Sequence, residues 1–161
     1  MSSIEATPTF VFASDSLKGT LSSQDTARLL GVAARTHFPS CTCVSVPMAD
    51  GGEGTTEALV VACGGTYREV CVHDPLERRI VARYGVLGGG RALIEVAAAS
   101  GLPLLVSEDR DPLNASSFGT GELVLDAIKA GCDDVTLALG GSATNDGGMG
   151  LMRALGVRFH D

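Results

Sequence analysis

The sequence has no tryptophan and few other aromatic residues, with two tyrosines and five phenylalanines among 161 residues. A core built from this chain must therefore consist mainly of Val, Leu, Ile and Ala. No apolar run approaches the ~18 residues that a membrane-spanning helix needs. The opening MSSIEATP lacks the basic and apolar regions of a secretory signal. These absences predict a globular, cytoplasmic protein that does not bind a membrane.

Positive charge is also scarce, since 12 Lys and Arg residues face 19 Asp and Glu residues and the net charge is −7. Binding to nucleic acid or to an anionic membrane surface needs a basic patch, which this composition does not supply. Neither partner is expected. An anionic substrate would have to be bound by backbone N–H groups, a few local cations and a metal ion.

The five cysteines do not form a standard disulfide or zinc pattern. Their number is odd, and the only close pair, Cys41 and Cys43, has a single residue between its members. We therefore assign no disulfide and no metal to them. Four cysteines that lie in or beside apolar segments are expected to be small buried side chains, namely Cys43, Cys63, Cys71 and Cys132.

Hydrophobic periodicity predicts a βαβα start to the chain. Strands are expected over 9–13 and 42–46, and helices over 23–37 and 54–63. Ser22 or Ser23 can cap the first helix and Thr55 or Thr56 the second, while Pro39 and Gly64 are suited to ending them. This order predicts a parallel sheet covered by helices.

From about Thr66 the pattern changes to three consecutive strand-like segments, at 66–74, 78–88 and 91–99. A helix over 117–131, a strand over 135–139 and a helix over 148–155 are expected to follow. We predict an α/β fold with two parts, which are the start of a Rossmann-like or flavodoxin-like domain at 1–73 and a second, strand-rich α/β domain at 74–161.

Three of the predicted strands lead into polar, glycine-containing loops. These loops are SDSLKGTLSS at 14–23, PMADGGEGT at 47–55 and GGSATNDGG at 140–148. Ligands of open α/β sheets bind outside the carboxyl ends of the strands, so the loops are expected to converge on one site. Glycines let backbone N–H groups approach a phosphate, and a helix N-terminus adds further donors. The alternative is that each loop is a sharp turn whose Asn and Asp residues only cap a helix.

Standard nucleotide-binding motifs are missing from the sequence. No Walker A sequence is present, and FGTGEL at 118–123 has Val124 where a dinucleotide fingerprint has its third glycine. A nucleotide site in this chain must therefore be of another kind.

Four long motifs resemble the type I glycerate kinase family. They are DSLKGTLSS at 15–23, PMADGGEGT at 47–55, FGTGEL at 118–123 and LGGSATNDGGMG at 139–150. The resemblance extends from about Phe10 to Asp161, with small departures at Leu17 and Phe118, where the family usually has an aromatic residue and frequently a tyrosine. Because family members are more than twice as long, we expect a fragment, a truncated product or one half of a split protein.

The resemblance implies that the second domain is inserted into the first, with the active site in the cleft between them. It also implies an ATP-dependent kinase that uses Mg²⁺ and transfers the γ-phosphate to D-glycerate, giving 2-phosphoglycerate. Alternatives are a kinase for another small acid, a non-catalytic binding module, or a half enzyme that needs a partner chain. The remaining half of the protein or a second copy of this chain is a possible partner.

Candidate site residues follow from these loops and from the resemblance. Lys18 can place a positive charge on a phosphate, and Asp146 is the candidate general base. Asp50 and Glu53 can bind Mg²⁺ or hydrogen-bond the hydroxyls of glycerate, although each could equally be a solvated loop carboxylate. The remaining candidates for substrate or nucleotide binding are Asp15, Ser16, Gly51, Gly52, Gly119, Thr120, Gly121, Gly140, Gly141, Ser142, Thr144 and Asn145.

Overall fold

The computed structural model describes residues 7–17, 20–46 and 48–160. The chain divides into two compact units, Met1–Asp50 and Gly51–Asp161. The larger unit thus begins ahead of its first helix. The predicted domain boundary at 73/74 and the predicted insertion of one domain into the other stay predictions about the whole protein.

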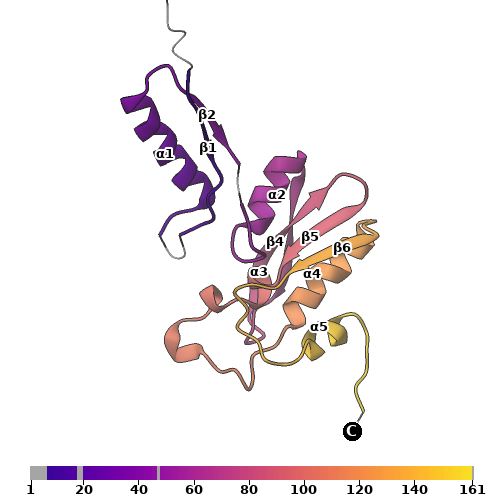
Figure 1. The fold of residues 1–161 in the computed structure, drawn as a ribbon. Helices are drawn as coiled ribbons and strands as arrows, with labels where there is room; N and C mark the ends of the chain where they lie inside the picture. The colour runs from indigo at the N-terminus through magenta and orange to yellow at the C-terminus, as the bar shows by residue number, and fades with distance from the viewer. Residues whose placement is uncertain (1–6, 18–19, 47, 161) are drawn as a thin grey trace, which may run out of the picture. The chain divides into compact units, whose positions relative to one another are not determined.

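The first unit is a βαβ motif (Figure 1). Strands β1 (Thr9–Phe12) and β2 (Thr42–Ser45) pair in parallel, and helix α1 (Ser23–His37) connects them. The expected parallel start of the sheet is therefore confirmed. The helix begins at Ser23 as predicted, and its cap is Ser22, one of the two predicted caps, whose hydroxyl accepts a hydrogen bond from the backbone N–H of Asp25 at 3.0 Å.

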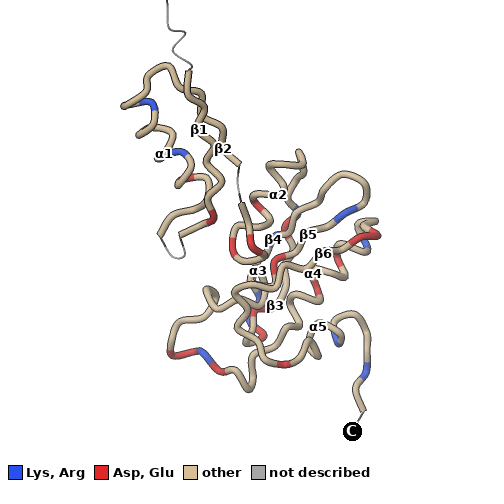
Figure 2. The backbone as a smooth tube through the Cα atoms, viewed as in Figure 1, with Lys and Arg blue, Asp and Glu red and all other residues tan. Residues whose placement is uncertain are grey.

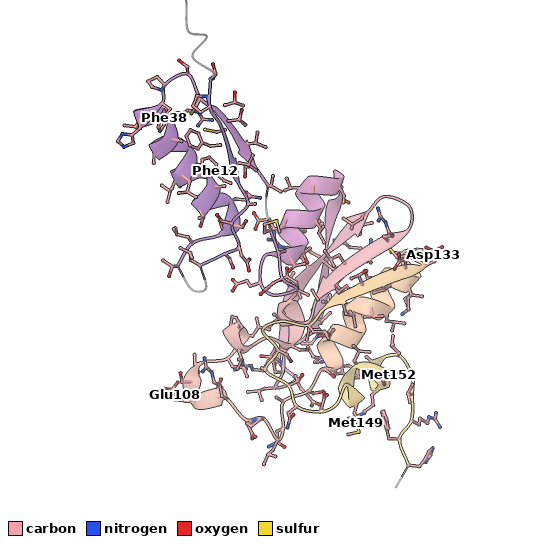
Figure 3. The ribbon with its side chains drawn as sticks, in the orientation of Figure 1. Phe12, Phe38, Glu108, Asp133, Met149 and Met152 are labelled. Carbon is pink, nitrogen blue, oxygen red and sulfur yellow. The ribbon has the colours of Figure 1, made fainter. Side chains whose placement is uncertain are left out.

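Aromatic side chains pack the first unit. The rings of Phe10 and Phe38 lie 5.3 Å apart, and Figure 3 shows Phe12 and Phe38 beside α1. Gly31 is buried on α1, and a Cβ added there would lie 3.8 Å from the Phe12 ring. Helix and sheet are thus held together by three phenylalanines.

The other face of this two-stranded sheet is exposed. Val11 is 60% exposed and Val44 41% exposed, at the positions that alternate with the packed ones. Neither strand carries a charged residue (Figure 2). Parallel sheets are normally covered on both faces, so the first unit leaves an apolar face uncovered.

The second unit is built on a four-stranded mixed sheet of order β3-β4-β5-β6. The first three strands pair antiparallel, and β6 adds in parallel to β5. The strands are β3 (Thr66–His73), β4 (Arg79–Leu87), β5 (Arg91–Glu95) and β6 (Asp134–Ala138). The helices are α2 (Thr55–Cys63), α3 (Ala97–Ser100), α4 (Phe118–Lys129) and α5 (Met149–Ala154), with short 3₁₀ turns at Leu102–Leu104 and Ser107–Asp109.

Its core lies between the sheet and α4. Val72, Tyr84 and Ile94 of the sheet pack with Leu123 and Ala127 of the helix, and all five residues are fully buried. Full burial of each Val, Leu or Ile side chain in this core contributes about 1.5–3 kcal/mol to stability. On β4, a Cβ at Gly85 would lie 2.7 Å from Val60 of α2. The absence of a side chain there lets α2 pack closely on the strand.

Three expectations about local structure are wrong. The predicted strand over 91–99 ends at Glu95, because the following alanines form α3 and Ala is the strongest helix former. Neither Thr55 nor Thr56 caps α2, whose N-cap is Gly54. Cys63 and Cys71 are exposed instead of buried. Among the described residues, no helix is long and apolar enough to cross a membrane.

Candidate functional site

Two of the predicted loops meet at Ser23 within the first unit. The Ser23 hydroxyl donates a hydrogen bond to the Ser14 carbonyl after β1 at 2.6 Å. It also accepts one from the backbone N–H of Met48, after β2, at 3.4 Å. Both loops leave the carboxyl ends of adjacent parallel strands, as the sequence predicts for ligand-binding loops. The sequence indicated Ser23 only as a possible cap.

Among the candidates in these loops, Asp15 is exposed, and its carboxylate accepts a hydrogen bond from the backbone N–H of Ser16 at 2.7 Å. This hydrogen bond joins adjacent residues of the loop. Asp50 ends the first unit and is engaged in an interaction of its own. Lys18 lies outside the described residues. The binding or catalytic roles of these residues stay predictions.

In the second unit, the DGGEG loop meets the glycine-rich loop that follows β6. The backbone N–H of Gly140 donates a hydrogen bond to the Gly51 carbonyl at 2.8 Å. A Cβ at Gly140 would lie 2.5 Å from the Cα of Gly52. Only glycine permits this approach, so these two candidate loops are brought together as the sequence predicts.

Glu95, at the carboxyl end of β5, caps α2 at this edge of the sheet. Its carboxylate accepts a hydrogen bond from the backbone N–H of Thr56 at 2.7 Å. The Thr55 hydroxyl instead donates to the Gly52 carbonyl at 2.8 Å. A carboxylate is well suited to a helix N-terminus because the helix dipole is positive there. Glu95 is not among the predicted site residues, and the only sequence signal for it is an acidic residue that ends an apolar strand.

The hydroxyls of the glycine-rich loop face each other. The oxygens of Ser142 and Thr144 lie 2.9 Å apart, and the Thr144 backbone N–H donates to the Ser142 hydroxyl at 3.1 Å. The loop is anchored by the backbone N–H of Ala143, which donates to the Ser100 carbonyl at 2.8 Å. Asn145 is exposed at the end of this segment. The loop therefore presents two hydroxyls and an amide on a fixed backbone.

Asp146 is held by four hydrogen bonds from the protein itself. Its carboxylate accepts from the backbone N–H and the hydroxyl of Ser117, each at 2.8 Å. It also accepts from the backbone N–H groups of Gly148 and Gly150, each at 3.0 Å. Burial opposes ionisation, but these donors outweigh it and hold the pKa of Asp146 below its ordinary value. Asp146 is therefore ionised at neutral pH and is a weak base.

The N-terminus of α5 is already occupied by protein groups. The Asp146 carboxylate accepts hydrogen bonds from the backbone N–H groups of Gly148 and Gly150. The Ser117 hydroxyl accepts one from the backbone N–H of Leu151 at 2.9 Å. The start of this helix therefore has few donors left for a phosphate. Within the described chain, the backbone N–H groups of 145–147 make no hydrogen bond. They are among the donors of the loop that remain available.

The glycines of FGTGEL serve close packing. A Cβ at Gly119 would lie 1.7 Å from the His73 carbonyl oxygen, and one at Gly121 would lie 2.4 Å from the Leu151 carbonyl oxygen. Thr120 is fully buried, and its hydroxyl lies 2.8 Å from that of Ser100. These three candidates thus support the glycine-rich loop from within the core. Their predicted contact with a ligand stays a prediction.

A charged network that the sequence did not reveal surrounds the turn between β3 and β4. Glu122 accepts a hydrogen bond from the His73 backbone N–H at 2.7 Å and lies 3.5 Å from Arg79. On the turn, Asp74 is almost fully buried. Burial opposes its ionisation, but hydrogen bonds from the backbone and side chain of Arg78 outweigh it and lower the pKa of Asp74. The network fixes this turn beside the start of α4.

No ready-made metal cluster lies in the described part of the chain, where no three His, Cys, Asp or Glu side chains converge. Glu53, one of the two predicted Mg²⁺ ligands, is exposed. Mg²⁺ typically takes one or two carboxylates, keeps several waters and binds the phosphates of the substrate. A loop with two carboxylates fits that chemistry, and the assignment of Mg²⁺ to Asp50 and Glu53 stays a prediction.

Comparison with known proteins gives consistent matches over almost all of the chain. A sequence model described as "Glycerate kinase family" matches residues 10–161. The chain is 47% identical over 152 residues to Glycerate 2-kinase of Escherichia coli (strain K12), covering 94% of this chain and 40% of that protein. It is 43% identical over 152 residues to Glycerate kinase of Bacillus subtilis (strain 168), with the same coverage of 94% and 40%.

A solved structure agrees with these matches. It is a protein of Salmonella typhimurium LT2 that carries the provisional name glycerate kinase 2, and it superposes with a TM-score of 0.77 at 44% identity. The match covers 93% of this chain and 40% of that one. The chain therefore spans about 40% of the length of the relatives that it matches.

Proposed function

Because the chain belongs to the glycerate kinase family, we propose that it takes part in transferring the γ-phosphate of ATP to D-glycerate. The observation that carries this proposal is the match over residues 10–161 to relatives named as glycerate kinases. We propose 2-phosphoglycerate as the product and the cytoplasm as the location. Because the chain spans about 40% of its relatives, a further polypeptide region completes the proposed active site.

The donors of the glycine-rich loop are suited to bind phosphate. The backbone N–H groups of 145–147 are available, and the hydroxyls of Ser142 and Thr144 lie in the same loop. Phosphoryl transfer depends mainly on positioning and on neutralising charge at the γ-phosphate. Mg²⁺ would supply such charge, with Asp50 and Glu53 as its predicted ligands, and Lys18 would add a cation.

Asp146 has two candidate roles, which measurements of turnover and of stability on the variant Asp146→Asn separate. As the predicted general base, it would accept a proton from the attacking hydroxyl of glycerate. Its four hydrogen bonds favour a positioning role, in which it holds the glycine-rich loop on α4. If Asp146 is the base, Asp146→Asn abolishes turnover while the fold remains intact. If it is a positioning residue, turnover and stability fall together.

The direct test is ATP consumption in the presence of D-glycerate and Mg²⁺. It should be run on this chain alone and on a fusion with the C-terminal 60% of the Escherichia coli relative, a share that follows from the 40% matched here. We expect turnover in the fusion, lost in Lys18→Ala and retained in Lys129→Ala, which alters the only other lysine. A folded fusion that consumes no ATP would contradict the proposal. The phosphorus NMR spectrum of the product distinguishes 2- from 3-phosphoglycerate.

A second candidate function, a non-catalytic module that binds a partner polypeptide, is favoured by the exposed sheet face of the first unit. Val11 and Val44 are 60% and 41% exposed on strands that carry no charge. We propose that the partner is the remaining part of a glycerate kinase, in the same or another chain. Light scattering of this chain, alone and mixed with that C-terminal part, tests this. A 1:1 complex is expected. If the chain instead associates with itself and does not bind the added C-terminal part, the result would favour a homo-oligomer.

A further inference from the structure

Two thiols lie in contact in the first unit, away from the loops described above. The sulfur atoms of Cys41 and Cys43 are 3.6 Å apart. Cys43 belongs to β2, and Cys41 immediately precedes that strand. Alternation along an extended chain places both on one face of the sheet. This face packs against α1, because the Cys43 sulfur lies 4.0 Å from the Gly31 carbonyl oxygen.

The spacing of these thiols is a poor match to a disulfide. Residues i and i+2 of an extended strand have Cα atoms about 6.6 Å apart. Disulfides have Cα atoms about 4.4–6.8 Å apart, most often near 5.5–6 Å. The spacing of this pair thus lies at the upper end of the disulfide range, away from the most frequent values.

The same spacing is a good match to a metal chelate. Two thiolates bound to one tetrahedral Zn²⁺, with Zn–S bonds of about 2.3 Å, have sulfur atoms ~3.8 Å apart. The observed separation of 3.6 Å is close to this value. The two side chains are therefore already arranged for a cation that bridges them.

The electrostatic surroundings accommodate a bound dication once the thiols lose their protons. Burial and the contact with Cys43 raise the pKa of the Cys41 thiol, so this thiol is protonated at neutral pH in the metal-free chain. The guanidinium of Arg35 on α1 favours the Cys41 thiolate. Binding of one divalent cation releases two protons, one from each sulfur, and leaves a neutral two-thiolate complex.

Although the sequence pattern alone assigns no metal to the cysteines, we propose from the contact of their sulfur atoms that Cys41 and Cys43 form a two-thiolate site for a soft divalent cation of the Zn²⁺ and Cd²⁺ class. Thiolates select such cations, whereas Mg²⁺ requires oxygen ligands. Because no third metal-binding side chain joins the pair within the described residues, water or a small thiol completes the coordination. The site is independent of the kinase proposal, since it involves none of the predicted glycerate or ATP contacts.

Cadmium titration of the reduced, full 161-residue chain tests the site, because the cadmium–thiolate charge-transfer absorption reports sulfur ligation directly. We expect one Cd²⁺ per chain at low concentration. Cys41→Ser and Cys43→Ser should each weaken binding at least ~10-fold, since even the loss of an outer hydrogen-bond partner of a metal ligand costs that much. The matched control is the double variant Cys63→Ser/Cys71→Ser, which removes two exposed thiols of the second unit and should bind as the original chain does.

A second measurement needs no variant and so does not depend on how the substituted chains fold. Bound Cd²⁺ should protect two of the five cysteines from alkylation, and peptide mapping identifies them. Protection of Cys41 and Cys43 is expected. Protection of Cys63 and Cys71 instead, no protection at all, or conversion of the pair to a disulfide that excludes the metal would each overturn the proposal.

Discussion

The Asp146 carboxylate accepts hydrogen bonds from both the backbone N–H and the hydroxyl of Ser117, each at 2.8 Å. The Ser117 hydroxyl in turn accepts a hydrogen bond from the backbone N–H of Leu151 in α5. One carboxylate and one hydroxyl thus join the starts of α4 and α5 and fix the loop between β6 and α5. The predicted ligand-binding loop is therefore preorganised by the protein before any ligand binds.

Removing the Asp146 carboxylate should destabilise the second unit. Asp146→Ala leaves the buried donors of Ser117 and Gly150 and the half-buried donor of Gly148 unpaired, and we expect a loss of about 2–3 kcal/mol in the free energy of unfolding. Asp146→Asn keeps one acceptor oxygen and should cost about half as much. Urea unfolding followed by tyrosine fluorescence measures this, because both tyrosines, Tyr67 and Tyr84, lie in the second unit. An Ala variant as stable as the original would show that these hydrogen bonds contribute nothing.

The stability of the second unit should fall in acid. Asp74, Asp126 and Asp146 all have folded-state pKa values below the ordinary value. The stability that they contribute is fully present above the pKa of about 3.9 of an unfolded Asp, and it is lost as the pH falls through the lower folded-state values. We expect a constant free energy of unfolding above about pH 5 and a steep fall below about pH 4.

Asp146→Asn provides the control for this pH dependence. Because the amide does not titrate, its free energy of unfolding should fall less between pH 5 and pH 3 than that of the original chain. Urea unfolding at a series of pH values gives both curves. Parallel curves for the two proteins would mean that the Asp146 pKa is not lowered by folding.

Gly119→Ala should disrupt the contact between α4 and β3. The added methyl group would lie 1.7 Å from the His73 carbonyl oxygen, which belongs to the backbone and cannot rotate away. We expect a loss of about 3 kcal/mol or more in stability. Gly88→Ala is the matched control, since a Cβ there meets no atom within 4 Å and the change should stay within about 0.5 kcal/mol. Thermal melts of the two variants make the comparison, and equal melting temperatures would contradict the predicted clash.

Glu77→Gly should stabilise the turn between β3 and β4. Glu77 has φ of +62°, in the left-handed region that is unfavourable for residues with a Cβ. Glycine removes this strain but adds backbone entropy to the unfolded chain, so the expected net gain is about 0.5–1 kcal/mol. Glu77→Ala removes the carboxylate and keeps the strain, and it should show no gain. A stabilised Ala variant would assign the effect to charge instead of backbone conformation.

Several elements could be predicted from the sequence almost to the residue. The first helix was predicted over 23–37 and occupies Ser23–His37, and the strand predicted over 135–139 occupies Asp134–Ala138. Their periodicities, caps and terminating residues are all local signals. The prediction failed at 96–99, where alternation continued into alanines that are better suited to a helix.

The candidate site could be predicted only in part, because long-range contacts decide which groups remain available. Glu95 accepts a hydrogen bond from Thr56 of α2 across 39 residues, and Ser117 pairs with Asp146 across 29 residues. Neither hydrogen-bonded pair produces a recognisable motif of closely spaced residues in the sequence. The FGTGEL motif is a further example. Its glycines pack against β3 and α5, but the same sequence pattern would be expected of glycines that bind a phosphate.

The sequence by itself determined the order of the strands and of the helices other than α3, the parallel start of the sheet and the family. These depend on the local alternation of apolar and polar residues and on motifs that are continuous in the chain. Only the tertiary structure decided that Asp146 and Ser117 fill the start of α5, that Glu95 caps α2 and that Cys41 and Cys43 come into contact. The physical reason is that a hydrogen bond or a metal chelate depends on positions in space, which folding sets for residues that lie far apart or on one face of a strand.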